Sequence, residues 1–273
     1  MTYQLTGSIV LYKNNEEVLI RAIDSCLSSS FNLILFLVDN SPTDELKKLS
    51  KDDRIEYMHN PSNPGFGASH NQALRLAIGA GSKHHFIINP DIYFEGDVIG
   101  RMVNYMDEHE DVGMIMPEVL YPEGDIQYLP KLLPSPLWIL RRKFKKPAGS
   151  FHRFINKYEL RYFPRDKIFN SPLLSGCFTL LNLKAIQEVG FYDDNFFMYF
   201  EDFDLSRRMH AKYKTIYFPH VSVYHQYEGG ANKSLKLFQI FISSAIYYFN
   251  KWGWFYDKER KLINARAISQ IQT

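Results

Sequence analysis

The chain has 273 residues, of which 45% are hydrophobic and 23% charged, and its net charge is +2. This composition supplies a sizeable core, excludes a disordered chain, and predicts one large domain or one domain with an appendage. The two cysteines, Cys26 and Cys177, have no metal-type spacing, which argues against a disulfide scaffold or structural zinc site and fits a reducing cytosol. Residues 1–12 do not form a secretory signal, and no stretch reaches the roughly 18 to 20 apolar residues of a spanning helix.

Strands and helices alternate along the first part of the chain. Apolar runs predict strands at 6–12, 33–38, 55–59, 86–88 and 112–116, and helical periodicity predicts helices at 16–29, 68–80 and 97–109. This alternation predicts an α/β fold with a mostly parallel central sheet flanked by helices. The glycines after the first strand form neither a dinucleotide-binding fingerprint nor a P-loop, which argues against those two classes of nucleotide-binding enzyme.

Polar residues follow three of the predicted strands, in the clusters 12–14, 39–41 and 89–91. Pro90 cannot donate a hydrogen bond to a sheet, so the strand before it ends there and Asp91 lies at its carboxyl end. Ligands of open α/β sheets bind just outside such ends, and a carboxylate there suits a divalent cation beside a phosphate. Asn-Pro-Asp is also an ordinary polar turn, but three coincident clusters favour a site.

The alternation stops between residues 121 and 171, where prolines fall among aromatic and basic residues. We predict a long, partly ordered excursion from the core at this point. Regular structure then returns as a strand at 173–182, helices at 184–189 and 201–211, two short strands at 215–219 and 221–225, and a helical C-terminal part.

Seven segments in a fixed order carry a resemblance to a known family: SIVLY, VDNSP, NPGFGASHNQA, NPD, SGCFTLLN, GFYDDNFFMYFEDFDLSRR and VYHQYEGG. This order resembles the family 2 inverting glycosyltransferases of GT-A fold, and it is most similar to their rhamnosyltransferase-like branch, where NPD replaces Asp-x-Asp. The resemblance covers roughly residues 5–230. It implies a GT-A catalytic domain at 1–230, containing a basic and aromatic excursion at about 122–172, and a helical C-terminal extension at 231–273.

The resemblance also implies a reaction. A sugar, in this branch rhamnose from dTDP-rhamnose, would pass with inversion from a nucleotide-diphosphate sugar to a hydroxyl of a glycan or lipid-linked glycan in cell-surface polysaccharide synthesis. Asp202 matches the general base, which takes the acceptor's proton as its oxygen attacks the anomeric carbon. The alternative for Asp202 and Asp204 is an acidic helix start, with an ion pair from Asp204 to Arg208. Arg207 and Arg208 would either reach a phosphate or lie on a solvated face.

Asp91 matches the residue that holds a divalent cation, Mg²⁺ or Mn²⁺, against the diphosphate. One carboxylate at this motif instead of two leaves a strict requirement for metal open. His225 matches a histidine that some relatives use as an additional ligand, and its alternative is a histidine that ends a strand and bonds to backbone. Asp39 matches the carboxylate near the base and ribose, with an Asx-turn as the alternative.

The remaining residues that we assign to nucleotide or donor binding come from the loops around these strand ends. They are Tyr12, Asn40, Gly65, Asn71, Asn89 and Gly176. Gly65 would let the backbone approach a ligand closely, and Gly176 would leave room for the donor sugar or the acceptor. A loop–helix junction and strand packing, respectively, are the alternatives for these two glycines.

A basic segment at 131–167 has eleven Lys and Arg against two acidic residues, a local net charge of +9 that leaves about −7 for the rest of the chain. Interleaved basic and aromatic residues can bind nucleic acid or an anionic membrane. The lipid-linked acceptor favours the membrane, so we expect no nucleic acid partner and a cytoplasmic protein, peripheral on the inner face of the cell membrane. Residues 235–256 predict either an interfacial helix or one that packs on the domain or on a second subunit of a homo-oligomer.

Two other functions remain open at this point. A sugar nucleotidyltransferase would share a related sheet, but it would have a glycine-rich basic motif after the first strand, which Leu11–Asn15 lacks. A non-catalytic glycan- or membrane-binding subunit could keep the same fold. Such a subunit should tolerate Asp202→Asn, whereas an inverting enzyme should not.

Overall fold

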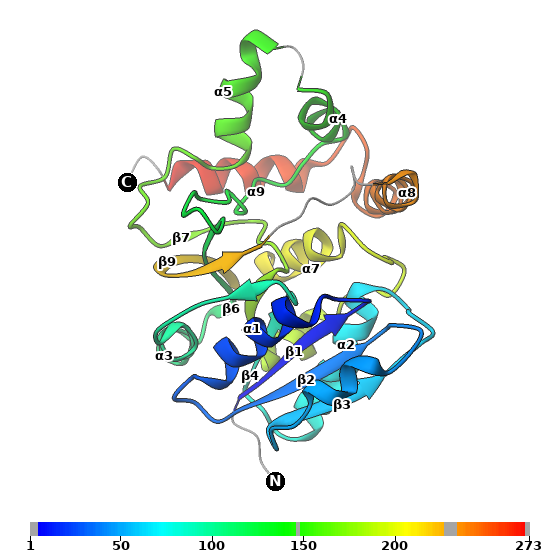
Figure 1. Ribbon diagram of the computed structural model, residues 1–273. Coiled ribbons are helices and arrows are strands. Elements are labelled where there is room, and N and C mark those ends of the chain that lie inside the picture. Colours follow the sequence, from blue (N-terminus) through cyan, green and yellow to red (C-terminus); the bar gives the residue numbers. More distant parts are fainter. Residues whose placement is uncertain (1–4, 146–147, 227–233, 271–273) are drawn as a thin grey trace.

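A computed structural model of the protein describes residues 5–145, 148–226 and 234–270. Within these residues the chain forms a sheet of nine strands in the order β3-β2-β1-β4-β8-β6-β9-β5, with β7 beside β9 (Figure 1). The strands are β1 (Leu5–Leu11), β2 (Leu33–Asp39), β3 (Ile55–His59), β4 (His84–Ile88), β5 (Ile92–Tyr93), β6 (Val112–Leu120), β7 (Phe169–Asn170), β8 (Phe178–Asn182) and β9 (Lys214–His225). The helices are α1 (Glu16–Leu27), the 3₁₀ helix η1 (Glu45–Leu49), α2 (Phe66–Gly79), α3 (Val98–Glu108), α4 (Pro136–Phe144), α5 (Ala148–Tyr158), α6 (Leu183–Val189), α7 (Glu201–His210), α8 (Leu235–Trp252) and α9 (Lys258–Ser269).

The four strands β3, β2, β1 and β4 form a parallel block, as their apolar runs and helical crossovers predict. Leu11 pairs with Asp39, and Ile9 with Ile88. The carboxyl ends of β1, β2 and β4 therefore lie along one edge of the sheet, with the polar clusters that follow them. Beyond β4 the sheet is mixed, since β8 is antiparallel to both β4 and β6, and β9 is parallel to β6.

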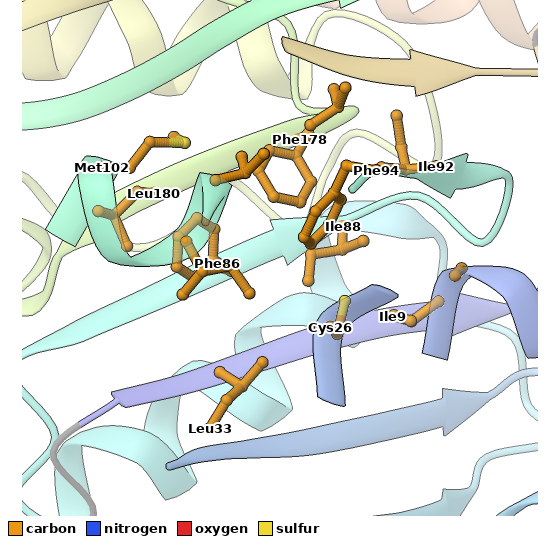
Figure 2. Packing of buried hydrophobic residues seen from close by; sticks show 14 of the residues in the cluster. Ile9, Cys26, Leu33, Phe86, Ile88, Ile92, Phe94, Met102, Phe178 and Leu180 are labelled. Carbon is orange, nitrogen blue, oxygen red and sulfur yellow. The ribbon is translucent and has the colours of Figure 1, made fainter. Parts of the chain in front are cut away.

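Alternation along the strands divides the core into two layers, one on each face of the sheet. On β2, Leu33, Leu35 and Leu37 face α1 and α3, whereas Phe36 and Val38 face α2, α6 and α7. Figure 2 shows the first layer, where Phe86 and Ile88 of β4 pack with Phe178 and Leu180 of β8. Both faces of the inner strands are covered, and this explains why those strands read as continuous apolar runs.

The excursion at 122–172 is more ordered than its prolines suggested. It contains α4 and α5, which stand over α9 at the end of the molecule away from β3 (Figure 1). Pro136 is compatible with a helix because it occupies the first turn, where its missing N–H has no intrahelical partner, and the side chain of Ser135 caps that turn. Phe154, Ile155 and Tyr158 of α5 are buried in the second core layer, so α5 is part of the main core.

The two strands predicted at 215–219 and 221–225 are one strand, β9. Its pairing with β6 jumps from Phe218 opposite Pro117 to Ser222 opposite Glu118. Pro219 lies in this irregularity, where no ladder hydrogen bond is required of it, so the strand continues past the proline.

Helices α8 and α9 pack against α7. Arg207 of α7 forms a buried pair with Asp257, with two N–O distances of 2.8 and 2.9 Å, and its guanidinium lies over the Trp252 ring. Asp204 is fully buried and accepts from Trp252 Nε1 at 2.8 Å, from Lys251 and from Arg208. The predicted pair from Asp204 to Arg208 is confirmed, but neither expectation for Arg207 and Arg208 holds, because both guanidinium groups are engaged inside the protein. No helix of the described segments is long and apolar enough to cross a membrane.

A buried polar network links β1 to β4 and α2. Ser8 Oγ lies 2.7 Å from both His70 Nδ1 and His85 Nε2, and His85 Nδ1 lies 2.8 Å from Thr6 Oγ1. Burial lowers the pKa of His85 to about 3 and holds the pKa of His70 well below its usual value. Both rings are therefore neutral in the folded protein near neutral pH.

We expect these two histidines to make the protein acid-sensitive. Below the unfolded pKa of about 6.5, both histidines take up a proton in the unfolded chain but stay neutral in the native protein. The free energy of unfolding therefore falls as the pH drops from about 6.5 toward 3, by up to about 1.4 kcal/mol per pH unit for each ring. Urea unfolding at pH 7, 6 and 5 measures this slope. His85→Gln should reduce the slope between pH 6 and 5, and an unchanged slope in that variant would contradict the assignment.

Candidate active site

A cavity of about 540 Å³ opens at the carboxyl ends of the central strands. Its wall brings together four of the predicted site residues, which are Asn89, Gly176, Asp202 and His225. Asn89 follows β4, Gly176 precedes β8, Asp202 lies in the first turn of α7, and His225 ends β9. Strand order thus assembles residues that are 136 positions apart in the chain, and of the three polar clusters after the strands only the one at 89–91 contributes to this cavity.

Asp91 and His225 form a pair beside this cavity. Asp91 Oδ1 lies 3.3 Å from His225 Nε2 and has no hydrogen-bond donor among the described residues. Gln127 fixes the histidine: its Nε2 donates to the His225 carbonyl at 2.9 Å, so its Oε1, 3.0 Å from His225 Nδ1, must accept from that nitrogen. Nε2 then faces the carboxylate, and a proton on Nε2 or a metal ion between the two residues would satisfy both atoms.

These two residues fit one side of a divalent cation site. A carboxylate oxygen and a neutral imidazole nitrogen are accepted ligands of Mn²⁺, and the bond from His225 Nδ1 to Gln127 is the outer contact that usually orients a ligating histidine. No third His, Cys, Asp or Glu joins them to form a metal cluster in the part of the chain that the structure describes. The remaining ligands would come from a bound diphosphate and from water, as is usual for such ions beside phosphates.

Asp202 has the chemistry of a base. Its Oδ1 accepts from the Phe203 N–H at 2.9 Å and its Oδ2 from the Gly176 N–H at 3.4 Å. Burial raises the pKa of Asp202 to about 6, against the opposing effects of the Gly176 N–H and the charge of Lys131. A carboxylate with this pKa is ionised at neutral pH and still accepts a proton readily, which suits general base catalysis.

The backbone before Asp202 is strained. Tyr199 and Phe200 both have positive φ, 70° and 66°, which costs free energy in residues that have a Cβ. The Phe200 side chain is buried between Phe203, Phe241 and Tyr248, and this packing holds the conformation. The chain therefore turns sharply into α7 and directs Glu201 and Asp202 into the cavity wall.

Sequence reasoning missed several ionisable residues of the cavity, which are Lys131, Arg142, Glu159, Arg161 and Glu201. Lys131 is 6% exposed, and burial lowers its pKa to about 8, with Arg142 adding to the effect and Glu159 and Asp202 opposing it. Glu201 is also buried, its Oε2 lacks a partner among the described residues, and burial, reinforced by Asp202, raises its pKa well above the usual value. A lone lysine between apolar residues, Leu129 to Leu133, was the available signal for Lys131. Glu201 was seen only as part of an acidic helix start.

Asp39 and Asn40 lie at the end of β2 with their side chains engaged. Asp39 Oδ1 accepts from the Ser41 N–H at 2.8 Å and Oδ2 from the Tyr57 hydroxyl at 2.6 Å. Asn40 donates to Ser69 Oγ of α2 at 2.8 Å. The turn geometry proposed as the alternative for Asp39 is present, while Tyr12 is half exposed at the same edge of the sheet. A role of these residues in nucleotide binding stays a prediction.

Gly65 and Asn71 hold the chain segment that leads to α7. Gly65 has φ 106°, and a Cβ on it would lie 2.2 Å from the Phe197 carbonyl oxygen, so its own packing requires glycine. Asn71 is fully buried, donates to the Tyr192 carbonyl and to Asp194, and accepts from the Tyr192 N–H. Asn71 does not line the cavity, and its role in nucleotide binding stays a prediction.

The fold and the cavity define a glycosyltransferase of GT-A type. The family described as Glycosyl transferase family 2 matches residues 8–190. The chain belongs to this family.

Two curated relatives show what members at this distance do. The chain is 23% identical over 211 residues to the low-salt glycan biosynthesis hexosyltransferase Agl10 of Haloferax volcanii. The matched region covers 76% of this chain and 62% of the relative. It is 24% identical over 206 residues to the N-acetylglucosaminyl-diphospho-decaprenol L-rhamnosyltransferase of Mycobacterium tuberculosis. This matched region covers 70% of the chain and 66% of the relative. The chain thus spans less than two thirds of the length of either relative.

Solved structures support the fold. The structure of GalNAc-T7 with UDP, GalNAc and Mn²⁺ matches with a TM-score of 0.68 and 13% identity, over 92% of this chain and 49% of that one. Staphylococcus aureus TarS, residues 1–349, matches with a TM-score of 0.60 and 12% identity, over 97% and 70%. At these identities the likeness concerns the fold, and the predicted GT-A architecture is confirmed.

Proposed function

We propose that this enzyme transfers a sugar from a nucleotide-diphosphate sugar to a hydroxyl group of a glycan or lipid-linked glycan, with inversion. The observation that carries the proposal is a buried, readily protonated carboxylate, Asp202, on the wall of the cavity that also holds His225 and Asn89. The acceptor oxygen attacks the anomeric carbon as its proton moves to Asp202. The bond from that carbon to the diphosphate breaks, and the nucleoside diphosphate leaves with the electron pair.

Asp91 and His225 would hold the divalent cation. Bound there, an Mg²⁺ or Mn²⁺ ion would offset charge on the departing diphosphate. Gln127 keeps the His225 ring in the tautomer that presents Nε2, and Asn89 lies 3.5 Å from the same nitrogen. Gly176 lines the cavity and orients Asp202 through its N–H.

Rhamnose from dTDP-rhamnose is the donor that we propose. The rhamnosyltransferase of Mycobacterium tuberculosis supports this sugar, while the Haloferax volcanii relative supports only a hexose. Thermal shift measurements with dTDP-rhamnose, UDP-glucose, UDP-galactose, UDP-GlcNAc and GDP-mannose, each with and without Mn²⁺, test the proposal, because a ligand that binds only the folded state raises the melting temperature. An increase in melting temperature with one donor would identify the sugar. No shift with any donor on folded protein would favour the non-catalytic subunit instead.

A membrane face is part of the proposal. Large apolar side chains on α4, on α8 and after α8 are between 64% and 87% exposed: Leu137, Phe144, Leu235, Phe255 and Tyr256. Lys143 lies in α4, Lys145 follows it as the C-cap, and Lys258 begins α9 just after Tyr256. Such a mixture suits the inner face of a membrane that contains anionic lipids. Sedimentation with phosphatidylglycerol vesicles, but not with phosphatidylcholine vesicles, is the expected result, and no sedimentation with either would rule this face out.

The pKa of Asp202 predicts the acid side of the pH profile. We expect kcat/KM to fall below about pH 6, by tenfold per pH unit, because protonated Asp202 cannot accept the acceptor's proton. Lys131 opposes the effect of burial, so Lys131→Met should raise the pKa of Asp202 and move this limb to higher pH. Lys157→Met, on the exposed face of α5, is the matched control. A limb that stays in place in Lys131→Met would contradict the role of Lys131.

The bond from Gln127 to His225 predicts a second measurable effect. Gln127→Leu removes the acceptor that fixes the His225 ring, and loss of such an outer contact usually lowers metal affinity by about 10- to 100-fold. The Mn²⁺ concentration that half-saturates activity should rise accordingly, while kcat at saturating Mn²⁺ should change less. Gln127→Glu restores an acceptor for Nδ1 and should recover part of the affinity. Equal Mn²⁺ dependence in all three proteins would show that Gln127 acts only on folding.

A further inference from the structure

Three acidic residues lie in the first turn of α7, and their carboxyl groups have different surroundings. Asp202 accepts from two backbone N–H groups, and Asp204 has three side-chain partners. Glu201 is only 6% exposed, yet its Oε2 has no hydrogen-bond partner among the described residues. A buried polar atom without a partner costs free energy in the folded state, so its presence in a cavity wall points to a ligand that supplies one.

Glu201 lies beyond the base, on the side away from the donor. The cavity of about 540 Å³ continues past Asp202 into a region that α4, α5 and α8 line. Glu201 and Asp202 belong to the wall of both parts, whereas Asn89 and His225 line only the first. An acceptor that reaches Asp202 through the second part therefore contacts the wall that Glu201 and Asp202 share.

The carboxyl group of Glu201 suits a neutral partner. Burial, reinforced by the charge of Asp202, raises the pKa of Glu201 well above its usual value. Arg161 lines the same cavity but pairs with Glu159. Glu201 is therefore protonated near neutral pH, with one O–H to donate and a carbonyl oxygen to accept, and it complements a hydroxyl group, which also donates and accepts.

Aromatic rings beside Glu201 indicate what carries this hydroxyl. Tyr199, Phe203 and Phe241 line the same part of the cavity. Apolar walls with a few fixed polar groups are typical of pockets that orient a small ring, and a sugar offers C–H faces to the aromatic rings and hydroxyls to the polar groups. Consecutive Cα atoms are about 3.8 Å apart, so carboxyl groups on consecutive residues of one wall can reach two adjacent hydroxyls.

We propose that Glu201 binds a second hydroxyl of the acceptor, on the carbon next to the one whose hydroxyl receives the sugar. The acceptor unit is then a sugar with two neighbouring free hydroxyls, and Glu201 selects it over a unit that lacks one of them. This inference rests on the proposed transferase activity, because Asp202 determines which hydroxyl reacts. It makes Glu201 a specificity-determining residue, and its loss should affect the acceptor and leave donor binding unchanged.

Transfer to octyl glycosides tests this role, with the donor that raises the melting temperature. The panel contains octyl glucoside, galactoside, mannoside, N-acetylglucosaminide and rhamnoside, and the linkage of the product identifies the reacting hydroxyl of the best acceptor. Removal of a hydroxyl next to it should lower kcat/KM at least tenfold, because a site that bonds to a hydroxyl rejects an analogue without it. No transfer to any glycoside by a protein that binds donor, or equal use of the deoxy analogues, would overturn the inference.

Glu201→Met tests whether this discrimination depends on Glu201. The variant should use the full glycoside at least tenfold less well than wild type, mainly through a higher acceptor KM, and should no longer distinguish it from the deoxy analogue. Glu201→Gln, whose amide can still donate, should recover most of the discrimination. Glu17→Met is the matched control, an exposed residue in the first turn of α1, and should behave as wild type. Discrimination that persists in Glu201→Met would overturn the assignment.

Melting temperatures separate this role from a structural one. Because Glu201 has a buried atom without a partner, Glu201→Met should melt at the temperature of wild type or above it. A clearly lower melting temperature would show that Glu201 supports the fold and would overturn the assignment. Donor binding by all variants without discrimination by wild type would overturn the acceptor contact alone, whereas wild-type protein that binds no donor would overturn the transferase proposal and this inference with it.

Discussion

Asp202→Asn is expected to lower kcat by about 10²- to 10⁴-fold, the usual contribution of a positioned general base. The substitution keeps the size of the side chain and its contact with the Phe203 N–H, but it removes the negative charge that accepts the acceptor's proton. Donor binding should persist, because Asp202 faces the acceptor hydroxyl. Initial rates of sugar transfer and thermal shift with the donor measure the two effects on the same protein.

Asp53→Asn is the matched control for this substitution. Asp53 is exposed and lies before β3, far from the cavity along the chain, so its amide should leave both kcat and donor binding unchanged. An Asp202→Asn protein that is folded, binds donor and keeps more than half of the wild-type kcat would identify Asp202 as a structural carboxylate. That result would also mean that another group of the cavity acts as the base.

Asp91→Ala is expected to remove the dependence of the reaction on divalent cation. Charge stabilisation by a metal ion is worth several kcal/mol in the transition state, so kcat/KM at saturating Mn²⁺ should fall by at least about 100-fold. A donor at 100 times its Kd stabilises the folded protein by about 2.7 kcal/mol, and the Mn²⁺-dependent part of this stabilisation should disappear. Rates and melting temperatures, each with Mn²⁺ and with EDTA, measure both effects.

His225→Gln provides the comparison for Asp91→Ala. The amide keeps a neutral oxygen or nitrogen near Asp91, so we expect a smaller loss and a response that higher Mn²⁺ concentrations partly restore. If Asp91→Ala shows the same Mn²⁺ response as wild type, the Asp91–His225 pair is held by a shared proton and the cation binds elsewhere.

The edges of the parallel strands were predictable because local signals determine them. Continuous apolar runs predict the buried strands, and Pro90 and the turn at Asp39 mark where two of these strands end. The carboxyl ends of β1, β2 and β4 lie at one edge of the sheet, as expected. Helices α4 and α5 were missed, because prolines dominate the local pattern and the burial of Tyr158 depends on distant core residues. Pro219 had the same effect on β9, whose continuation depends on an irregular pairing with β6.

The site was predictable only where a motif carries the chemistry. Asp91, Asp202 and His225 stand in recognisable segments: Asp202 and His225 line one cavity, and Asp91 pairs with His225 beside it. Gln127 and Lys131 have no such segment: Gln127 bonds to His225 across the fold, and the charge of Lys131 lowers the pKa of Asp202 from a distant part of the chain. No local pattern in the sequence records such a contact. Asn71, a polar residue in a matching motif, anchors the loop after α6, which its local sequence did not indicate.

The buried pair between Arg207 and Asp257 also bears on where this enzyme can be shortened. Loss of one partner of a buried ion pair typically costs about 3–5 kcal/mol, because the other charge remains without compensation in the interior. A chain ending near residue 230 would lose Asp257, Trp252 and Lys251 together, which would leave Arg207 without its buried carboxylate and Asp204 with Arg208 as its charged partner, both on α7, the helix that carries Asp202 in its first turn. Lys251, Trp252 and Asp257 therefore hold α7 in place, and an isolated N-terminal fragment would be a poor template for engineering new sugar specificities.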